Sequence, residues 1–454
     1  MKNLKKNQLI LLSILLLSIL LFPAICIAES QSEREWLAKG KQFLGKQDYD
    51  NALLAFNEAI QLNPQDSIAY ACRGNTYYYK KQYDLAIADY TKAIELNPQF
   101  AVAYCNRGLS YAHKGQYDLA IADFNKTIEL NPQDADTYFY RGFSYDNKGL
   151  SDAAIADYTK AIKLNSQDAK AYCNRGILYD TKGQHDLAIA DYTKAIELSP
   201  QFAGAYLNRG LSYDHKGLYD TAIADYTKAI ELNPQLADAY YNCGNSYDHK
   251  GLYDTAIAAY TKAIELNPQF AVAYCNRGNS YAHKGQYDLS LADFTKAIEL
   301  NPQNAKAYHN RGLSYYNKTQ YDLAIADFNK VIELTPQDAT AYDNRGTSYD
   351  SKGQYELAIA DHTKAIELNP QFADAYYNRG ISYYHKGQYD AAIADYTKAI
   401  ELNPQDAYAY EGRATCHYKL GEKKAAKEDF ELFLKYASPD DKRVEMVKKR
   451  LLEL

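Results

Sequence analysis

The chain has 454 residues and a formal net charge of −6, because 57 Asp and Glu outnumber 51 Lys and Arg. A protein without a net basic footprint has no electrostatic means of displacing the counterions of DNA or RNA, so nucleic acid is excluded as an expected partner. The length by itself would suggest about three domains. A repeat that runs through almost the entire sequence indicates instead a single series of similar units.

Residues 1–28 have the features of an export signal. Three lysines precede an apolar run at 9–22, and Ala28 offers a small residue for cleavage. We expect cleavage after Ala28, which would leave the repeats in the periplasm or secreted. Two alternatives remain open. One is lipidation at Cys26, and the other is an uncleaved inner-membrane signal anchor that keeps the repeats outside and limits membrane contact to this segment.

A 34-residue unit is repeated twelve times between residues 33 and 440. Gly40 recurs at this spacing as far as Gly380, and Pro64 recurs as far as Pro404, with Ser166 as the interior exception. A fixed period of this length is typical of stacked supersecondary units, not of a globular domain with an enclosed active site. The predicted units are 33–66, 67–100, 101–134, 135–168, 169–202, 203–236, 237–270, 271–304, 305–338, 339–372, 373–406 and 407–440.

Each unit is predicted to contain two helices and two turns. In the unit 203–236, apolar residues recur at helical spacing within 206–213 and again within 222–230. Gly217 suits the left-handed turn that ends the first helix. Pro234 ends the second helix, because proline restricts the residue before it and cannot continue the hydrogen-bond ladder. The pattern therefore predicts an all-α fold of helix A, turn, helix B, turn.

Counted from the first residue of each unit, positions 4, 8, 11, 20, 24, 27 and 32 resemble the tetratricopeptide repeat. In the unit 203–236 these positions hold Tyr206, Gly210, Tyr213, Ala222, Tyr226, Ala229 and Pro234. The resemblance implies a solenoid, a right-handed superhelix of about twelve antiparallel helix pairs whose A helices line a concave groove. Residues 441–454 are predicted to form a capping helix, because Val444, Val447 and Leu451 fall on one stripe.

Two positions depart from the usual family pattern. Position 7 is Arg in ten of the twelve units, position 23 is Asp in ten, and the exceptions in both columns fall in the first and seventh units. Columns whose exceptions coincide are expected to touch. We predict structural ion pairs within single repeats, namely Arg73 with Asp89, Arg175 with Asp191, Arg209 with Asp225 and Arg379 with Asp395. The alternative is an arginine array that binds an anionic ligand.

The resemblance places position 6 on the groove side of helix A, and this position is asparagine in eight units: Asn106, Asn174, Asn208, Asn242, Asn276, Asn310, Asn344 and Asn378. The asparagine amide carries both a donor and an acceptor, so the row can bond the backbone of an extended peptide. The row resembles the asparagine ladder of the tetratricopeptide superhelix in O-linked N-acetylglucosamine transferases. Tyr241 and Tyr377 are further groove candidates. Alternatively, each asparagine bonds a neighbouring helix and stabilises the groove wall.

No metal or cofactor is expected. Histidine occupies position 13 of five units, as His113, His215, His249, His283 and His385. One histidine per repeat is too sparse for metal ligands, which must lie within a few ångströms of one another, so we expect these side chains to cap helix C-termini instead. The six cysteines beyond residue 28 have no paired spacing and are expected to be free.

The expected function is that of a non-enzymatic scaffold that binds protein or peptide partners in extended form, in cell-envelope assembly or secretion. An enzyme is disfavoured, because the sequence contains no phosphate-binding loop, nucleophile elbow or metal-spaced His and Glu set. The alternative is a carbohydrate-binding or polysaccharide-export accessory protein that uses groove tyrosines, among them Tyr78 and Tyr316. The sequence specifies no oligomeric state.

Overall fold

The computed structural model describes residues 31–454, which form helices and turns and contain no strand. The predicted export signal at 1–28 lies outside the described residues. Helices alternate between the A and B positions of the repeat. The A helices are α2 (Gln31–Gly45), α4 (Ser67–Tyr79), α6 (Ala101–His113), α8 (Ala135–Asn147), α10 (Ala169–Thr181), α12 (Ala203–His215), α14 (Ala237–His249), α16 (Ala271–His283), α18 (Ala305–Asn317), α20 (Ala339–Ser351), α22 (Ala373–His385) and α24 (Ala407–Leu420).

Each A helix is followed by a B helix of similar length. The B helices are α3 (Tyr49–Leu62), α5 (Tyr83–Leu96), α7 (Tyr117–Leu130), α9 (Ser151–Leu164), α11 (His185–Leu198), α13 (Tyr219–Leu232), α15 (Tyr253–Leu266), α17 (Tyr287–Leu300), α19 (Tyr321–Leu334), α21 (Tyr355–Leu368), α23 (Tyr389–Leu402) and α25 (Lys423–Tyr436), and α26 (Arg443–Glu453) follows them. The alternation of helix and turn is therefore the one that the sequence pattern predicts.

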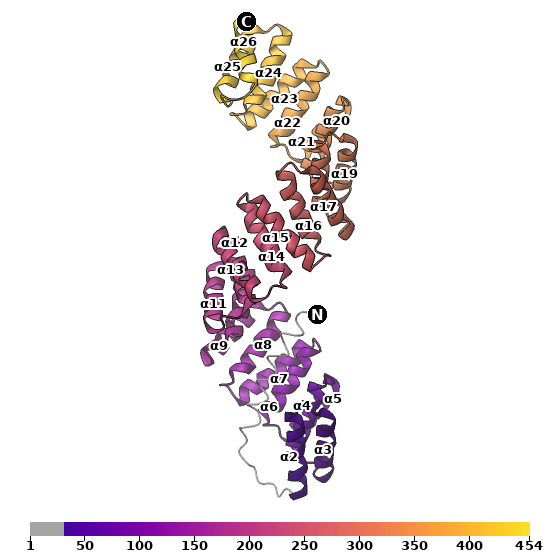
Figure 1. The fold of residues 1–454 in the computed structure, drawn as a ribbon, viewed down its shortest axis with the longest axis vertical. Coiled ribbons are helices and arrows are strands. Elements are labelled where there is room, and N and C mark those ends of the chain that lie inside the picture. The colour runs from indigo at the N-terminus through magenta and orange to yellow at the C-terminus, as the bar shows by residue number, and fades with distance from the viewer. Residues whose placement is uncertain (1–30) are drawn as a thin grey trace. The chain divides into compact units, whose positions relative to one another are not determined.

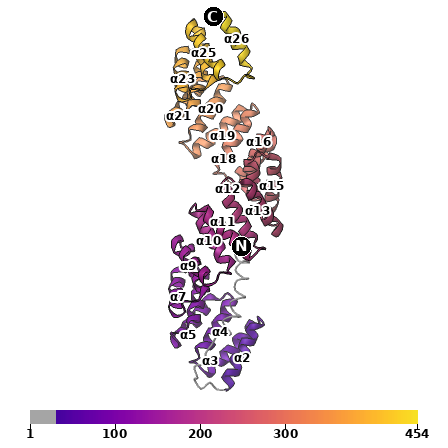
Figure 2. The same cartoon turned by 90° about the vertical axis from the view of Figure 1, so that its left-hand side faces the viewer.

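The described part of the chain divides into two compact units, one that ends at Gly217 and one from Leu218 to Leu454. Within each unit, every B helix packs against the A helix before it and the A helix after it (Figures 1 and 2). Successive A helices also touch, as α4 with α6 in the first unit and α20 with α22 in the second. No two successive B helices pack as closely among the described residues. The A helices therefore form the tighter side of each stack, which is the side expected to meet an extended partner.

The turns form where glycine and proline predict them. Gly217 has a φ of +72°, and Gly115 has the same value after α6. Three repeats lack glycine at this position, and there Gln47, Lys81 and Thr319 adopt φ values of 58–60°. L-residues with a side chain pay a steric penalty in this region, most of all a β-branched one such as Thr319. The left-handed turn is thus imposed by the fold even where the residue does not favour it.

Small and aromatic residues alternate in the core of each repeat. Ala222, Tyr226 and Ala229 of α13 are fully buried. The glycine at position 8 of helix A lies against the aromatic residue at position 24 of helix B. A Cβ placed on Gly74 would lie 2.8 Å from a ring carbon of Tyr90, closer than carbon atoms normally approach. Only glycine lets the two helices reach this separation, because any side chain would displace the ring.

The last helix covers the end of the second unit. Val444 and Val447 of α26 are buried in a cluster with Phe430 and Phe433 of α25. This arrangement agrees with the predicted capping helix at the end of the chain. Terminal repeats have a neighbour on one side only, so an additional amphipathic helix removes their exposed apolar surface from water. Among residues 31–454, no helix combines the length and the apolarity that crossing a membrane would require.

Candidate functional site

The predicted arginine–aspartate pairs are formed on the side of the repeat where helix A meets helix B. Arg175 donates from Nε to Oδ2 of Asp191 at 2.8 Å and from Nη2 to Oδ1 at 2.7 Å. Arg73 with Asp89 and Arg379 with Asp395 have the same two-pronged geometry. The aspartates are buried, and bidentate contacts of this kind are the stronger type of ion pair. The hydrogen bonds to Asp191 raise the pKa of Arg175.

Arg209 and its predicted partner belong to different compact units of the chain. Arg209 donates from Nη1 to Oγ1 of Thr193 at 3.0 Å, within the first unit. Its predicted partner, Asp225, belongs to the second unit. The pairing of Arg209 with Asp225 therefore stays a prediction.

Each arginine also makes a contact that the sequence comparison missed. Arg175 donates from Nη1 to Oγ1 of Thr159 at 2.9 Å, and Thr159 belongs to the preceding repeat. The same bond recurs from Arg73 to Asn57 and from Arg379 to Thr363. Position 25 is the feature of the sequence that could have predicted this contact, because it is Thr or Asn in every repeat except the last. The last repeat has Glu431 there and no arginine of a following repeat to bind. The arginine therefore joins two repeats as well as two helices.

These contacts argue against an arginine array that binds anions. The guanidinium of Arg175 lies between Tyr172 and Tyr179, with its central carbon 5.8 and 5.7 Å from the two ring centroids. Nε, Nη1 and Nη2 all donate to groups of the protein. With aromatic rings nearby and all three nitrogens donating to groups of the protein, the side chain has a structural role.

The asparagine row lies along the A helices, and all eight side chains are half-buried. In six of them the amide nitrogen contacts a side chain of the preceding A helix. The partners are Asn75 for Asn106, the sulfur of Cys173 for Asn208, Asn245 and Tyr241 for Asn276, Asn279 for Asn310, His309 for Asn344 and Asp343 for Asn378. Asn174 and Asn242 lie at the same position of α10 and α14. The row therefore helps to join successive A helices, as the structural alternative predicts.

These contacts limit what the row can offer a peptide. An amide that donates to the neighbouring helix keeps its carbonyl oxygen as an acceptor for a backbone N–H. A peptide would thus be held through its donors along most of the row. Peptide binding by these asparagines stays a prediction.

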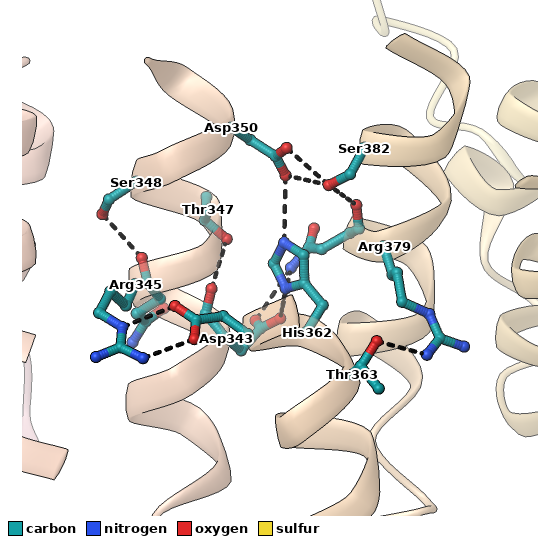
Figure 3. A network of polar contacts seen from close by, with 12 residues as sticks. Asp343, Arg345, Thr347, Ser348, Asp350, His362, Thr363, Arg379 and Ser382 are labelled. Atoms are coloured by element: carbon teal, nitrogen blue, oxygen red, sulfur yellow. Dashed lines mark hydrogen bonds and ion pairs between the residues drawn. The ribbon is translucent and has the colours of Figure 1, made fainter. Parts of the chain in front are cut away.

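Asn378 donates to Asp343, which belongs to a buried polar cluster of the second unit (Figure 3). His362 occupies the core position that is aromatic in the other repeats and is fully buried. Its Nδ1 lies 2.7 Å from Oδ1 of Asp343, and its Nε2 lies 3.2 Å from Oδ2 of Asp350. Ser382 donates to Asp350 at 2.7 Å. Burial by itself would lower the pKa of His362, but the two carboxylates outweigh it and raise that pKa to about 9.

Position 9 of helix A varies from repeat to repeat. It lies one helical turn after position 6 and on the same face. In the first unit, Phe143 of α8 and Ile177 of α10 occupy it, and each remains 38% exposed. In the second unit, Asn245 and Asn279 occupy it and accept from the asparagine row. Phe143 and Ile177 are thus exposed apolar side chains on the A-helix side of the first unit.

The tyrosines proposed for the groove are mostly packed against the repeat. Tyr78 is buried, so the expectation that it faces a ligand is wrong. Tyr241 lies 4.8 Å from Phe270 between ring centroids, and Tyr377 lies 5.8 Å from Tyr396. Both are half-buried. A half-buried ring that packs at a tilt against a neighbouring ring presents less free face for stacking on a sugar.

The position-13 histidines contact the preceding repeat. His113, His249 and His283 end their helices and stack on Tyr83, Tyr219 and Tyr253, with centroids 5.0–5.1 Å apart and planes within 12°. Desolvation lowers the pKa of His113. These side chains therefore pack against the preceding repeat while remaining exposed, and the expectation that they cap helix C-termini stays a prediction.

The histidines are not everywhere too sparse for metal ligands, and the expectation that no metal is bound stays a prediction. Asp180, His185 and His215 bring one ligand atom each to within 4.8 Å of one another. Counting only position 13 gave a single histidine per repeat. Position 13 of one repeat lies against position 17 of the repeat before it, and position 17 holds a histidine at His185.

Sequence profiles of known families agree with this architecture. Profiles described as tetratricopeptide repeat match residues 36–66, 101–134, 124–156, 169–202, 191–224, 237–270, 271–304, 305–338 and 373–406. A profile described as TPR repeat matches 74–115, 151–183, 215–251 and 348–387. The chain belongs to the tetratricopeptide repeat family. No curated protein matches this tetratricopeptide repeat chain.

Several solved structures resemble it. Cut9, in the APC/C hetero-tetramer Cut9–Hcn1, is 16% identical over 93% of this chain and 97% of its own, with a TM-score of 0.48. Yeast Tom70 is 18% identical over 93% and 96%, with a TM-score of 0.40. YrrB, described as a TPR protein with an unusual peptide-binding site, is 31% identical over 40% of this chain and 95% of its own, with a TM-score of 0.37.

Proposed function

We propose that the chain is a non-enzymatic scaffold that binds extended protein segments along its A helices, in cell-envelope assembly or secretion. Tetratricopeptide repeats typically mediate protein–protein interaction. The proposal rests on one observation above all. Exposed apolar side chains at Phe143 and Ile177 stand on the same helix face as the asparagine row.

This combination suits a peptide backbone flanked by apolar side chains. Burying Phe143 and Ile177 against a ligand removes apolar surface from water, which favours binding. The carbonyl oxygens of the asparagine row can accept from the ligand backbone. Recognition through backbone donors and shallow apolar contacts selects for an extended shape more than for a particular sequence.

The spacing of the repeats defines the register of such a ligand. Neighbouring helices pack roughly 10 Å apart, and an extended chain advances about 3.3 Å per residue. Every third residue of the ligand would therefore meet an equivalent position of the next repeat. We expect segments with an apolar residue at about every third position to bind best.

A pair of double variants tests the apolar contact. Phe143→Ser with Ile177→Ser should weaken binding to an array of extended peptides by roughly tenfold or more. The control is Leu85→Ser with Leu119→Ser, which changes residues that are 48% and 49% exposed on B helices of the same unit. The control should bind normally. Equal binding by both double variants and the unchanged protein would reject the apolar contact.

The asparagine row needs its own variant. Asn208, Asn242 and Asn276 changed together to alanine should leave the helical content intact and reduce peptide capture. If the triple variant loses folded protein but its folded fraction still binds peptide, the row only joins successive A helices and does not bind the ligand. A glycan array probed in parallel distinguishes the carbohydrate-binding alternative, since peptide binding predicts no signal there.

The place of action rests on residues 1–28. If the segment is an export signal cleaved after Ala28, the mature protein begins at Glu29. Mass spectrometry of the protein recovered from a secreting host tests this directly. A mature chain that retains residues 1–28 in the membrane fraction would support the signal anchor instead, and an intact chain in the cytoplasm would reject export.

A further inference from the structure

We propose that Asp180, His185 and His215 form a binding site for a divalent transition-metal cation, with Zn²⁺ as the expected occupant. Two imidazoles and one carboxylate are the ligand types that Zn²⁺ takes in proteins. The three side chains come from the end of α10, the start of α11 and the end of α12, all in the first unit. Its three residues are distinct from those proposed to bind peptide, although Asp180 follows Ile177 by one turn of α10.

One substitution in the repeat pattern creates the cluster. Position 17 is tyrosine in nine of the twelve repeats and histidine only at His185. Where the next repeat has a histidine at position 13, this tyrosine stacks on it, as Tyr253 does on His283 with planes 10° apart. At His185 and His215 the ring centroids are 4.9 Å apart but the planes are tilted by 41°. The aromatic stack is thus replaced by two nitrogen-bearing rings that no longer lie parallel.

The carboxylate of Asp180 is held in place by groups that are not ligands. Ser212 donates to Oδ2 at 2.6 Å, and the hydroxyl of Tyr192 donates to the same oxygen at 3.3 Å. These bonds leave Oδ1 directed at Nδ1 of His185, which lies 2.8 Å away. Hydrogen bonds of this kind fix the orientation of a ligand before the metal arrives.

The distances are close to those of a bound metal. A tetrahedral zinc ion with ligands at about 2.1 Å separates those ligands by roughly 3.4 Å. The three ligand atoms already lie within 4.8 Å of one another, so small side-chain rotations suffice. The cation would take the place of the present hydrogen bond between Nδ1 of His185 and Oδ1 of Asp180.

The surroundings permit a cation to enter. His215 is exposed, while Asp180 and His185 are half-buried. Lys216, which follows His215, is paired with Asp186, so its charge is offset by a neighbouring carboxylate. Three protein ligands leave at least one position open to water or to a group of a bound partner.

The experiment uses the full, untagged chain freed of metal with a chelator. Titration with ZnCl₂ alone, followed by calorimetry, should show one saturable equivalent per chain. Co²⁺ used as a spectroscopic probe should give visible d–d absorption, which a purely structural cluster would not produce. Cys72 is a weak competitor, since desolvation raises the pKa of its half-buried thiol to about 11.

Two single substitutions make the test specific. His185→Tyr restores the tyrosine found at this position in most repeats. The variant should therefore fold normally and no longer bind the one equivalent of Zn²⁺. Tyr253→His should add a second equivalent, because Asp248 and His283 stand where Asp180 and His215 do, and Ser280 already bonds Asp248 as Ser212 bonds Asp180. Absence of saturable binding, or equal binding by His185→Tyr, would overturn the proposal.

Discussion

Two histidines replace tyrosines in this chain, and their surroundings give them opposite properties. His185 takes position 17 at the surface of the first unit, and His362 takes position 24 in the core of the second. The side chain of His185 is 26% exposed, whereas that of His362 is 0% exposed. Each lies near the aspartate at position 12 of its repeat, Asp180 in one case and Asp350 in the other.

The difference lies in which nitrogens remain available. Both nitrogens of His362 contact carboxylates, which favours a buried cation and leaves no lone pair for a metal (Figure 3). Only one nitrogen of His185 contacts a carboxylate, and a second histidine, His215, lies beside it. Burial between two acids produces a structural imidazolium, while partial exposure beside one acid produces a candidate metal ligand.

The largest effect is expected when the buried cluster loses one acid. Asp343→Ala should lower the free energy of unfolding of the second unit by about 3–5 kcal/mol, because it leaves a buried charge with one partner fewer. Urea unfolding combined with amide hydrogen exchange of α20 to α22 measures this loss. The control Asp322→Ala breaks an exposed ion pair with Lys352 and should leave both measurements unchanged. A similarly small effect of Asp343→Ala would show that His362 is neutral.

The second effect concerns pH. The folded-state pKa of His362, about 9, lies above the ordinary value of 6.5. Its contribution to stability is therefore fully present below about pH 6.5 and is lost as the pH rises through 9, by about 3 kcal/mol in total. Urea unfolding from pH 6 to pH 10 measures the loss.

A double variant provides the control for this pH dependence. Asp343→Cys with His362→Tyr reproduces the combination of Cys173 and Tyr192 found around Asp180 in the first unit. Without the buried imidazolium, the alkaline loss of stability should disappear. If the double variant and the unchanged protein lose stability equally between pH 6 and pH 10, the loss has another origin.

A smaller effect is expected at the surface cluster. Asp180→Ala removes the acceptor of Ser212, Tyr192 and His185, and should cost about 1–2 kcal/mol in metal-free protein. Partial exposure limits the cost, because water can replace some of the lost bonds. Chemical unfolding of the first unit in the presence of a chelator checks the value. A loss as large as that of Asp343→Ala would remove the contrast between the two clusters.

The smallest effect belongs to His185→Tyr. Without metal, the change in the free energy of unfolding should stay within about 0.5 kcal/mol, because the same tyrosine–histidine stack occurs between Tyr83 and His113. With Zn²⁺ present, only the unchanged protein should gain thermal stability. Differential scanning fluorimetry with and without ZnCl₂ measures both. A gain of equal size in His185→Tyr would place the metal elsewhere.

Comparing repeats within one sequence predicts contacts inside a repeat well. The coincident exceptions at positions 7 and 23 led to Arg175 and Asp191, and the structure forms that pair. The bond from Arg175 to Thr159 was not predicted, because it joins position 25 of one repeat to position 7 of the next. The cluster around His185 was not predicted for the same reason, since its neighbouring histidine belongs to the next repeat.

The asparagine row shows a different limit. Its regular recurrence indicates that position 6 matters, and the sequence left a ligand and a neighbouring helix as equal alternatives. In the structure most of the amide nitrogens point to the preceding A helix, as from Asn310 to Asn279. A spacing of 34 residues is compatible with both roles. Only the distance between successive A helices decides which partner lies within reach.

The sequence by itself determined the helix pair. The period, the glycine at position 8, the aromatic residue at position 24 and the glycine and proline turns fix one repeat through contacts between residues close in the chain. The tertiary structure decided how each repeat lies on the next. That placement joins Asp180 and His185 to His215, and Asp343 to Asn378, because the offset between stacked helices depends on side-chain packing, which spacing along the chain does not encode.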